Sequence, residues 1–134
     1  MEFLIEESNK KYGVDINYIN SMDHPVHIGK SKKIILYRAV NELIINIIKH
    51  SGSREAEIES SQNENFIFLR VEDTGAGFDL NKLKDKDFRG FGIYSISERI
   101  NNLGGDFTLS SKPGKGTKIL ISLSYNCHEA NLVF

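Results

Sequence analysis

The sequence predicts an α+β fold, a two-layer α/β sandwich in which helices cover one face of a mixed β-sheet. Three observations support this prediction. The chain of 134 residues and 15.2 kDa has the size of one domain. Two segments repeat apolar residues every three to four positions, as amphipathic helices do. Several shorter segments show alternating or continuous apolar residues, which are typical of strands in a sheet.

The first thirty residues are expected to form a helix, a strand and a loop. Helical spacing extends to about Lys11, and Gly13 ends the helix. A strand with one buried face follows it. Residues 20–30 are predicted to be a loop, because Pro25 and Gly29 interrupt regular structure. The strand is indicated by three alternating apolar residues: Val14, Ile16 and Tyr18.

A long helix is predicted over about Ser31–His50, with Ser31 as its N-cap and Ser51-Gly52 as its stop. Apolar residues follow one side of this helix, and polar residues form a stripe on the other side, into which Ile45 projects. The apolar side contains Leu36, Val40, Leu43, Ile44 and Ile47. The polar stripe contains Arg38, Glu42, Asn46 and Lys49.

Two strands and a charged loop are expected next. Ala56 and Ile58 indicate a short strand. Phe66–Glu72 is apolar on both faces except at Arg70, so this strand is placed in the centre of the sheet. The charged segment Asp79–Phe88 is expected to be a surface loop.

The last part of the chain predicts a helix and a β-hairpin. Gly90-Phe91-Gly92 opens the helix, and Gly104-Gly105 closes it at the C′ position. Two final strands, Phe107–Ser111 and Thr117–Tyr125, are joined by a glycine-containing turn. The buried stripe of the helix is predicted to contain Ile93, Ile96, Ile100 and Leu103.

Charge and composition exclude several classes of protein. Seventeen Lys and Arg against 18 Asp and Glu give a net charge of −1, so the basic excess of a general nucleic-acid binder is missing. The apolar stretch Leu43–Ile48 is far shorter than the ~20 residues of a membrane span. The acidic N-terminus is unlike a signal peptide, and Cys127 has no second cysteine with which to pair. We therefore expect a cytoplasmic domain that contacts neither nucleic acid nor membrane.

The helix stripe has the residue types that bind phosphates together with a divalent cation. Magnesium prefers oxygen ligands and keeps several waters. Asn46 offers one neutral carbonyl oxygen, which would hold magnesium adequately where phosphate oxygens supply the negative charge. Lys49 can neutralise a phosphate. For this stripe alone, the alternative interpretation is a solvated helix face.

The loop Asp73-Thr74-Gly75-Ala76-Gly77 follows a predicted strand and suits an adenine ring. Its two glycines let the backbone approach a flat ligand without contact from a Cβ atom. Asp73 can accept a hydrogen bond from an exocyclic amine, which adenine presents and guanine lacks at that ring position. A simple turn is the alternative, because Asp and Gly are common in turns.

The segment Gly90-Phe91-Gly92 lies at a predicted helix start, with Gly114, Gly116 and Thr117 downstream. Free N–H groups at a helix N-terminus can bind an anion. The segment matches neither a P-loop nor a dinucleotide-binding fingerprint. Taken alone, a short Gly-x-Gly segment is more often a packing or turn motif than a binding site.

Taken together and in this order, the three groups resemble the nucleotide-binding motifs of the GHKL, or Bergerat-fold, ATPases. The chain is most similar to the catalytic ATP-binding domain of bacterial sensor histidine kinases. Tyr37–Ser51 resembles the N box of the family, Val71–Asp79 its first glycine box and Gly90–Ile93 its second. Leu103–Gly105 and Gly114–Thr117 are similar to its closing block.

The resemblance covers about residues 14–124 and implies ATP and Mg²⁺ as cofactors. The N box is most similar to the subgroup whose kinases pair with LuxR-type response regulators, because a Glu precedes Asn46 by four positions and Lys49-His50 follows. The resemblance implies that Asn46 ligates magnesium and that Glu42 binds or orients a water in the magnesium shell. Lys49 and His50 would contact phosphate.

The resemblance also assigns the adenine site and the lid. Asp73 would bind the adenine amine, with support from Thr117 directly or through water. The segment Asp79–Arg89 would be the ATP lid, in which Arg89 is the expected phosphate contact. The glycines complete the site: Gly75 and Gly77 would shape the adenine pocket, and Gly90 and Gly92 would border the phosphates.

The function that the resemblance implies is donation of the γ-phosphoryl group of ATP to a histidine on a separate dimerisation domain, with a response regulator as an indirect partner. None of the four histidines of the chain lies on a suitable acceptor helix, so the acceptor is expected elsewhere. Two alternatives stay open: an anti-sigma-factor-type serine kinase, and a nucleotide-gated protein-binding switch. Residues 1–12 are expected to end a linker helix, 13–125 to form the ATP-binding domain and 126–134 to be a tail.

Overall fold

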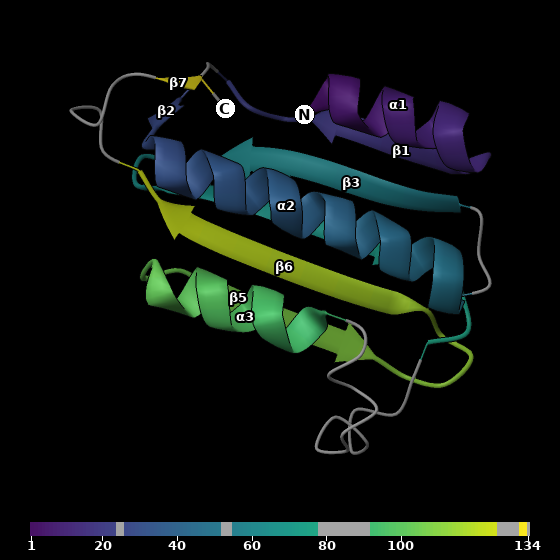
Figure 1. Cartoon of the computed structure of the whole chain (residues 1–134). Helices are drawn as coiled ribbons and strands as arrows, with labels where there is room; N and C mark the ends of the chain where they lie inside the picture. Colours follow the sequence, from purple (N-terminus) through teal and green to yellow (C-terminus); the bar gives the residue numbers. More distant parts are fainter. Residues whose placement is uncertain (24–25, 52–54, 78–91, 126–131, 134) are drawn as a thin grey trace.

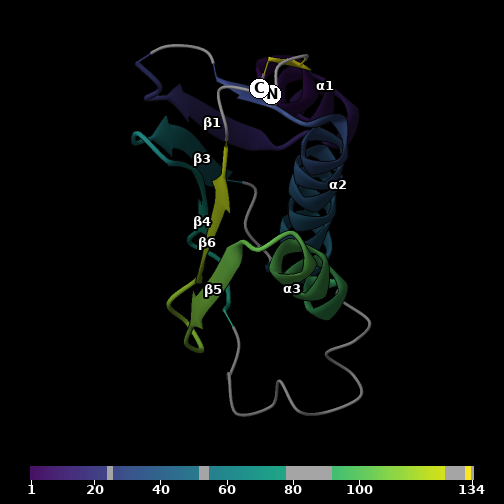
Figure 2. The ribbon, with the colours of Figure 1, turned by 90° about the vertical axis from the view of Figure 1, so that its left-hand side faces the viewer.

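The chain folds into two layers, with a five-stranded sheet on one side and helices on the other (Figures 1 and 2). The structure is a computed structural model that describes residues 1–23, 26–51, 55–77, 92–125 and 132–133. This arrangement confirms the predicted α+β sandwich. The helical elements are α1 (Glu2–Tyr12), α2 (Lys30–Asn46), the π-helical turn η1 (Ile47–Ser51) and α3 (Ile93–Asn102). The strands are β1 (Asp15–Asn20), β2 (His27–Ile28), β3 (Glu55–Gln62), β4 (Phe66–Asp73), β5 (Asp106–Ser111), β6 (Thr117–Ser124) and β7 (Leu132–Val133).

The main sheet has the strand order β1-β3-β4-β6-β5. β1 runs parallel to β3, whereas the other neighbours are antiparallel, so the sheet is mixed as predicted. β4 lies in the centre, which also agrees with the sequence. β3 is longer than the short strand expected around Ala56 and Ile58, since it extends from Glu55 to Gln62.

The core fills the space between the helices and one face of the sheet. Side chains of β4 alternate between buried and half-buried positions. The half-buried outer face holds Arg70, the expected exception to the apolar pattern, which forms ion pairs with Glu57, Glu59 and Glu72. The most deeply buried residues from the helices and the sheet include Leu36, Val40, Leu43, Ile44, Ile58, Ile67, Leu69, Ile100 and Ile121.

The helix ends agree with the sequence in one case and differ in another. After α3, the N–H groups of Gly104 and Gly105 donate to the carbonyl oxygens of Asn101 and Ile100, which is the hydrogen-bond pattern of a Schellman cap. The N-cap of α2 is Gly29 instead of Ser31, and no side chain caps it. α2 also ends earlier than predicted, because its last turn widens into η1.

Two short strands lie in segments that were expected to be a loop and a tail. Within residues 20–30, β2 pairs antiparallel with β7 of the C-terminal segment. Neither strand spans more than two residues, which is too short for an alternating pattern to be visible in the sequence.

Helix α1 packs on the first edge of the sheet. Ile5 is buried in the core. The side chain of Asn9 both accepts a hydrogen bond from the Ile16 N–H and donates one to the Ile16 carbonyl oxygen, at 2.9 and 3.1 Å. These bonds satisfy backbone groups at the open edge of β1. None of the helices in the described part of the chain combines the length and apolarity of a membrane-spanning segment.

Candidate functional site

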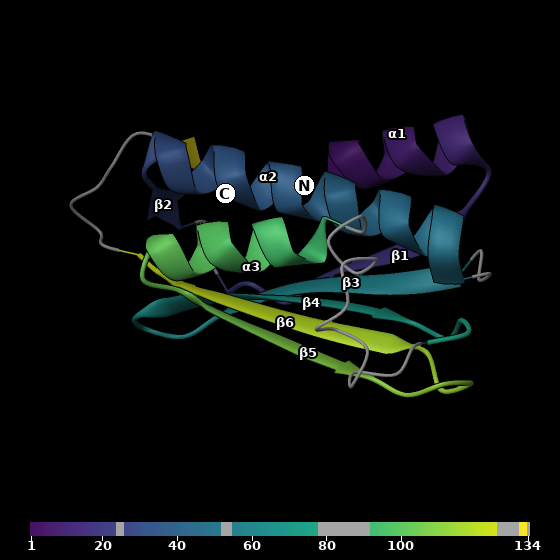
Figure 3. The same cartoon turned by 60° about the horizontal axis from the view of Figure 1, so that its bottom comes forward.

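The three motifs meet at one end of the sandwich. Figures 1 and 3 show that the carboxyl ends of α2 and β4, the amino end of α3 and the β5–β6 turn lie toward this same end. The polar stripe ends at the carboxyl end of α2, and the Asp73 loop follows β4. The two remaining glycine segments lie at the start of α3 and in the β5–β6 turn. The fold therefore brings together residues that are far apart in the chain.

A cleft of about 340 Å³ opens where β4, β5 and β6 meet the hairpin turn. Its volume lies at the lower end of the range of small-molecule sites. Polar and cationic residues line it together with two carboxylates, those of Glu72 and Asp73. The lining residues are Glu72, Asp73, Ser110, Ser111, Lys112, Lys115, Gly116, Thr117 and Lys118.

Asp73 places an almost fully buried carboxyl group at the end of β4, where it is 7% exposed. The N–H of Gly75 donates to its Oδ1 at 2.8 Å, and the backbone of Thr117 also donates to the carboxyl group. Burial raises the pKa of Asp73, and the two backbone hydrogen bonds oppose this shift. The carboxyl group therefore has a fixed orientation and little exposure to solvent. Both properties suit it to accept a hydrogen bond from a ligand.

Thr117 lies opposite Asp73 in the β4–β6 pairing and adds a second acceptor. The hydroxyl of Ser111 donates to the Gly116 carbonyl oxygen at 2.9 Å and lies 3.0 Å from Thr117 Oγ1. Because a serine hydroxyl has one proton, the Ser111–Thr117 contact needs the Thr117 hydroxyl as donor. The free lone pair of Thr117 Oγ1 can then accept a hydrogen bond. Asp73 and Thr117 together offer acceptors to a ligand.

The loop after β4 and the hairpin turn are in direct backbone contact. A Cβ atom on Gly77 would lie 2.1 Å from the Lys112 carbonyl oxygen, and one on Gly116 would lie 2.1 Å from the Asp73 carbonyl oxygen. Both glycines have positive φ angles, +62° and +74°. Gly114 donates to the Ala76 carbonyl oxygen. Gly77 was expected to leave space for a ligand, but its missing side chain makes room for the hairpin backbone.

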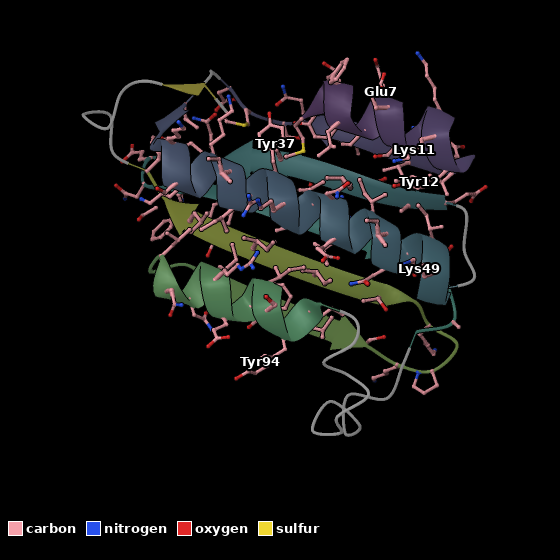
Figure 4. All side chains as sticks on the ribbon, in the orientation of Figure 1. Glu7, Lys11, Tyr12, Tyr37, Lys49 and Tyr94 are labelled. Atoms are coloured by element: carbon pink, nitrogen blue, oxygen red, sulfur yellow. The ribbon has the colours of Figure 1, made fainter. Side chains whose placement is uncertain are left out.

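The polar stripe of α2 approaches the site from the helical layer. Glu42 and Lys49 are exposed, and Asn46 is half-buried at the last residue before η1. Figure 4 shows Lys49 near the carboxyl end of α2. Glu42 and Asn46 supply two oxygen donors one turn apart on the same face, a donor set that suits Mg²⁺ shared with phosphate oxygens. π-helical turns often occur at functional positions, and η1 contains Lys49 and the backbone of His50.

Gly92 brings the start of α3 close to the polar stripe of α2. It is the N-cap of α3 with a φ angle of +74°, and a Cβ atom there would lie 3.4 Å from the Glu42 carboxylate. Glu42 and Gly92 also line a second pocket, of about 70 Å³, between α2 and α3. Neither Asn46 nor Lys49 is among the residues that line this pocket or the cleft.

Some predicted site residues lie outside the described part of the chain. They are Arg89, Gly90 and the lid segment Asp79–Arg89, together with the side chain of His50. Of the remaining predictions, Asp73, Gly75 and Thr117 come together at the sheet end, and Glu42 and Gly92 come together between the helices.

Sequence analysis missed Ser111 and Arg99, which line the cleft and the second pocket respectively. Ser111 could have been found from the hairpin, because it is the last strand residue before the turn and pairs with Thr117. Arg99 could have been found from its position seven residues after Gly92, which places both on one face of α3.

Comparison with known proteins gives one family and a consistent set of relatives. The family described as "Histidine kinase-, DNA gyrase B-, and HSP90-like ATPase" matches residues 31–126. The chain is 31% identical over 121 residues to the signal transduction histidine-protein kinase/phosphatase DegS of Bacillus subtilis. It is 31% identical over 96 residues to the sensor protein VraS of Staphylococcus saprophyticus.

These matches cover 90% and 72% of the chain but only 31% and 27% of DegS and VraS. The chain therefore spans less than a third of the length of these relatives. Among solved structures, the histidine kinase AdeS of Acinetobacter baumannii has the same fold, with a TM-score of 0.70 and 21% identity, over 93% of this chain and 64% of that one.

The contact between Gly116 and Asp73 predicts a large effect of a single methyl group. We expect Gly116→Ala to lower the free energy of unfolding by about 3 kcal/mol or more, because Cβ would overlap the Asp73 carbonyl oxygen in addition to the strain of a positive φ. Gly114→Ala is the matched control, since Gly114 has a φ of +76° but no atom within 4 Å of its Cβ position. It should cost about 1 kcal/mol. Urea denaturation measures both, and equal losses would contradict the close packing.

The raised pKa of Asp73 predicts a pH-dependent gain in stability for Asp73→Asn. Because the pKa is higher in the folded state, the folded protein binds more protons than the unfolded one, and wild-type stability falls as pH rises through the carboxyl range. Asn cannot ionise, and it keeps one amide oxygen as an acceptor for the backbone N–H groups of Gly75 and Thr117. We expect Asp73→Asn to be more stable than wild type at about pH 7 and to lose this advantage below about pH 4.

Urea unfolding at several pH values tests this expectation, and Asp106→Asn is the control, because it makes the same chemical change at an exposed position of β5. A variant Asp73→Asn that is less stable than wild type at neutral pH would show that the ionised form is the favoured one.

Proposed function

The chain belongs to the family of histidine kinase-, DNA gyrase B- and HSP90-like ATPases, and from this premise we propose that it is the ATP-binding catalytic domain of a sensor histidine kinase. The relatives DegS and VraS, a histidine-protein kinase/phosphatase and a sensor protein, support the choice within the family. In this proposal the domain binds Mg-ATP and donates the γ-phosphoryl group to a histidine that lies outside this chain.

The observation that carries the proposal is a pair of acceptors, the buried Asp73 at the end of β4 and the half-buried Thr117 opposite it on β6. Asp73 and Thr117 present a carboxylate and a hydroxyl lone pair to the cleft. The exocyclic amine of adenine is a donor that matches them, whereas guanine presents a carbonyl oxygen at that position. If GTP bound, its carbonyl oxygen would face the Asp73 carboxylate, and neither acceptor would have a hydrogen-bond donor. The site should therefore bind ATP much more strongly than GTP.

The phosphates are proposed to extend from the cleft toward α2 and α3. Asn46 would ligate Mg²⁺ through its amide oxygen, and Glu42 would hold a water of the magnesium shell. Bound there, Mg²⁺ would neutralise the charge that develops on the phosphate oxygens. Lys49 would bind phosphate, and Gly92 would let the phosphates approach the amino end of α3 without a side chain in the way.

The same proposal includes residues whose placement the structure does not describe. His50, Arg89 and Gly90 are proposed phosphate contacts, and Asp79–Arg89 is the proposed lid. Gly75 is proposed to border the adenine. Phosphoryl transfer requires little covalent chemistry from the protein. These residues would therefore act by positioning ATP and by neutralising the charge on its phosphates.

The partners follow from the proposed reaction. They are ATP, the histidine-bearing dimerisation domain of the same kinase and, indirectly, a response regulator of the LuxR type. We place the reaction in the cytoplasm. Residues 1–12 are proposed to lead from the dimerisation domain as α1, which packs on the catalytic unit of residues 13–125, and residues 126–134 are proposed to follow that unit, with β7 paired to β2.

Nucleotide binding tests the proposal directly. We expect the chain to bind ATP with Mg²⁺ at micromolar to millimolar Kd and to bind GTP at least about a hundredfold more weakly. Asp73→Asn should weaken ATP binding by at least about tenfold and reduce the ATP preference, because the amide of Asn is a poorer acceptor and adds a competing donor. Isothermal titration calorimetry measures these constants. Asp106→Asn again serves as the matched control, and an Asp73→Asn protein that binds ATP like wild type would contradict the adenine assignment.

A further inference from the structure

The small pocket between α2 and α3 contains two arginines, Arg38 and Arg99, that the proposed nucleotide site does not use, beside Glu42 and Gly92, which that site does use. Figures 1 and 3 show the two helices side by side on the outer surface of the helical layer. The pocket has a volume of about 70 Å³, which accommodates a carboxylate-sized group and is far too small for a nucleotide.

Two arginines from different helices line this pocket, Arg38 from α2 and Arg99 from α3. Both residues are exposed, and neither has an ion pair with any residue in the described part of the chain. Two like charges at one small pocket repel each other, and an anion bound between them would remove that repulsion. Guanidinium groups bind oxyanions through parallel hydrogen bonds.

The charge of the pocket favours a monoanion. Glu42 contributes one negative charge beside the two arginines, so the three groups have a net charge of +1. A single carboxylate neutralises that charge. A phosphate dianion would exceed it and would approach the Glu42 carboxylate, which is unfavourable.

The rest of the pocket strengthens binding of a carboxylate. Ala39 and Ile96 are buried at 3% and 5% exposure and supply an apolar wall, which lowers the local dielectric and strengthens ionic hydrogen bonds. Ser95 adds a hydroxyl donor from the first turn of α3, where the helix dipole also favours an anion.

The position of the pocket indicates a protein as the source of this carboxylate. Arg38 lies on the same stripe of α2 as Asn46, eight residues and therefore about 12 Å away along the helix. Under the proposed function, the phosphates lie near Asn46 and Glu42, so the pocket is just beyond their outer end. Ile34, one turn before Arg38, is 41% exposed and offers an apolar contact beside it, which a small free anion would not use.

From these observations we infer that the α2–α3 pocket binds one Asp or Glu side chain of a partner protein docked at the phosphate end of the nucleotide site. This inference rests on the proposed function for the location of the phosphates. Arg38 and Arg99 clamp the carboxylate, Ser95 donates a further hydrogen bond, and Glu42 sets the net charge of the pocket.

The test uses nuclear magnetic resonance titration of the full chain with an alanine-based helical peptide that has one central Glu, compared with the same peptide with Gln. Only the Glu peptide is expected to shift the amide resonances of Ser95 and Ile96 and the Arg99 Nε–H. Arg38→Gln and Arg99→Gln should each weaken binding by about tenfold. Lys30→Gln, which removes an exposed charge from the start of α2, should change it less than about twofold.

Four results would overturn the inference. The Gln peptide could bind as well as the Glu peptide, or Lys30→Gln could weaken binding as much as the arginine variants, which would indicate apolar contact or general charge. Inorganic phosphate could bind the same resonances more tightly than the Glu peptide at equal ionic strength, which would indicate a phosphate site. Saturating Mg-ADP could exclude the peptide, which would make the pocket part of the nucleotide site.

Calorimetry with ATP separates this inference from the proposed function. If the chain bound no Mg-ATP while the arginine-dependent Glu binding remained, the proposed function would fail and the carboxylate pocket would stand. If ATP bound as expected and the Glu peptide did not, only the inference about the pocket would fail.

Discussion

The structure depends on keeping one carboxyl group oriented in a place where water hardly reaches it. Asp73 is nearly buried at the end of the central strand, and burial raises its pKa. Backbone N–H groups of Gly75 and Thr117 offset part of the unfavourable desolvation. The loop after β4 and the β5–β6 turn, which flank these donors, are in backbone contact, and this contact requires glycine at positions 77 and 116. A ligand that donates a hydrogen bond to Asp73 would add to the two backbone bonds of its carboxyl group. The carboxyl group therefore has fewer hydrogen bonds without a ligand than with one.

The second half of the site is built on a different layer by a different mechanism. One side of α2 packs on the sheet, so polar residues can occupy the other side. They recur there about every four residues and form the polar stripe. α3 begins beside this stripe, and Gly92 approaches the Glu42 carboxylate at the point where any side chain would contact it. A nucleotide that joins the two halves would connect the sheet to the helical layer. Its adenine would be selected at the sheet end and its phosphates held at the helices, so binding and specificity are physically separate.

Local rules in the sequence predicted much of this arrangement. The Gly104-Gly105 closure of α3, the central position of β4 and the polar stripe through Asn46 follow from spacing within one segment, and the structure confirms them. What the sequence did not reveal depends on contacts between distant segments. Ser111 matters because it is paired with Thr117, the missing side chain of Gly77 makes room for the hairpin, and Arg99 meets Arg38 only when α3 packs beside α2. The ion pairs of Arg70 with Glu57 and Glu59 were likewise not predicted, because these glutamates lie on the neighbouring strand β3.

The central claim is that one nucleotide contacts both the buried carboxylate of the sheet and the amide of α2. The most direct measurement is the set of resonances that Mg-ADP perturbs in a ¹H–¹⁵N titration of the whole chain. We expect the backbone amides of Gly75 and Thr117 and the side-chain amide of Asn46 to shift together with a single Kd, and the omission of Mg²⁺ to weaken the shift of Asn46 most. Shifts confined to one of the two layers, or two different dissociation constants, would contradict a shared site.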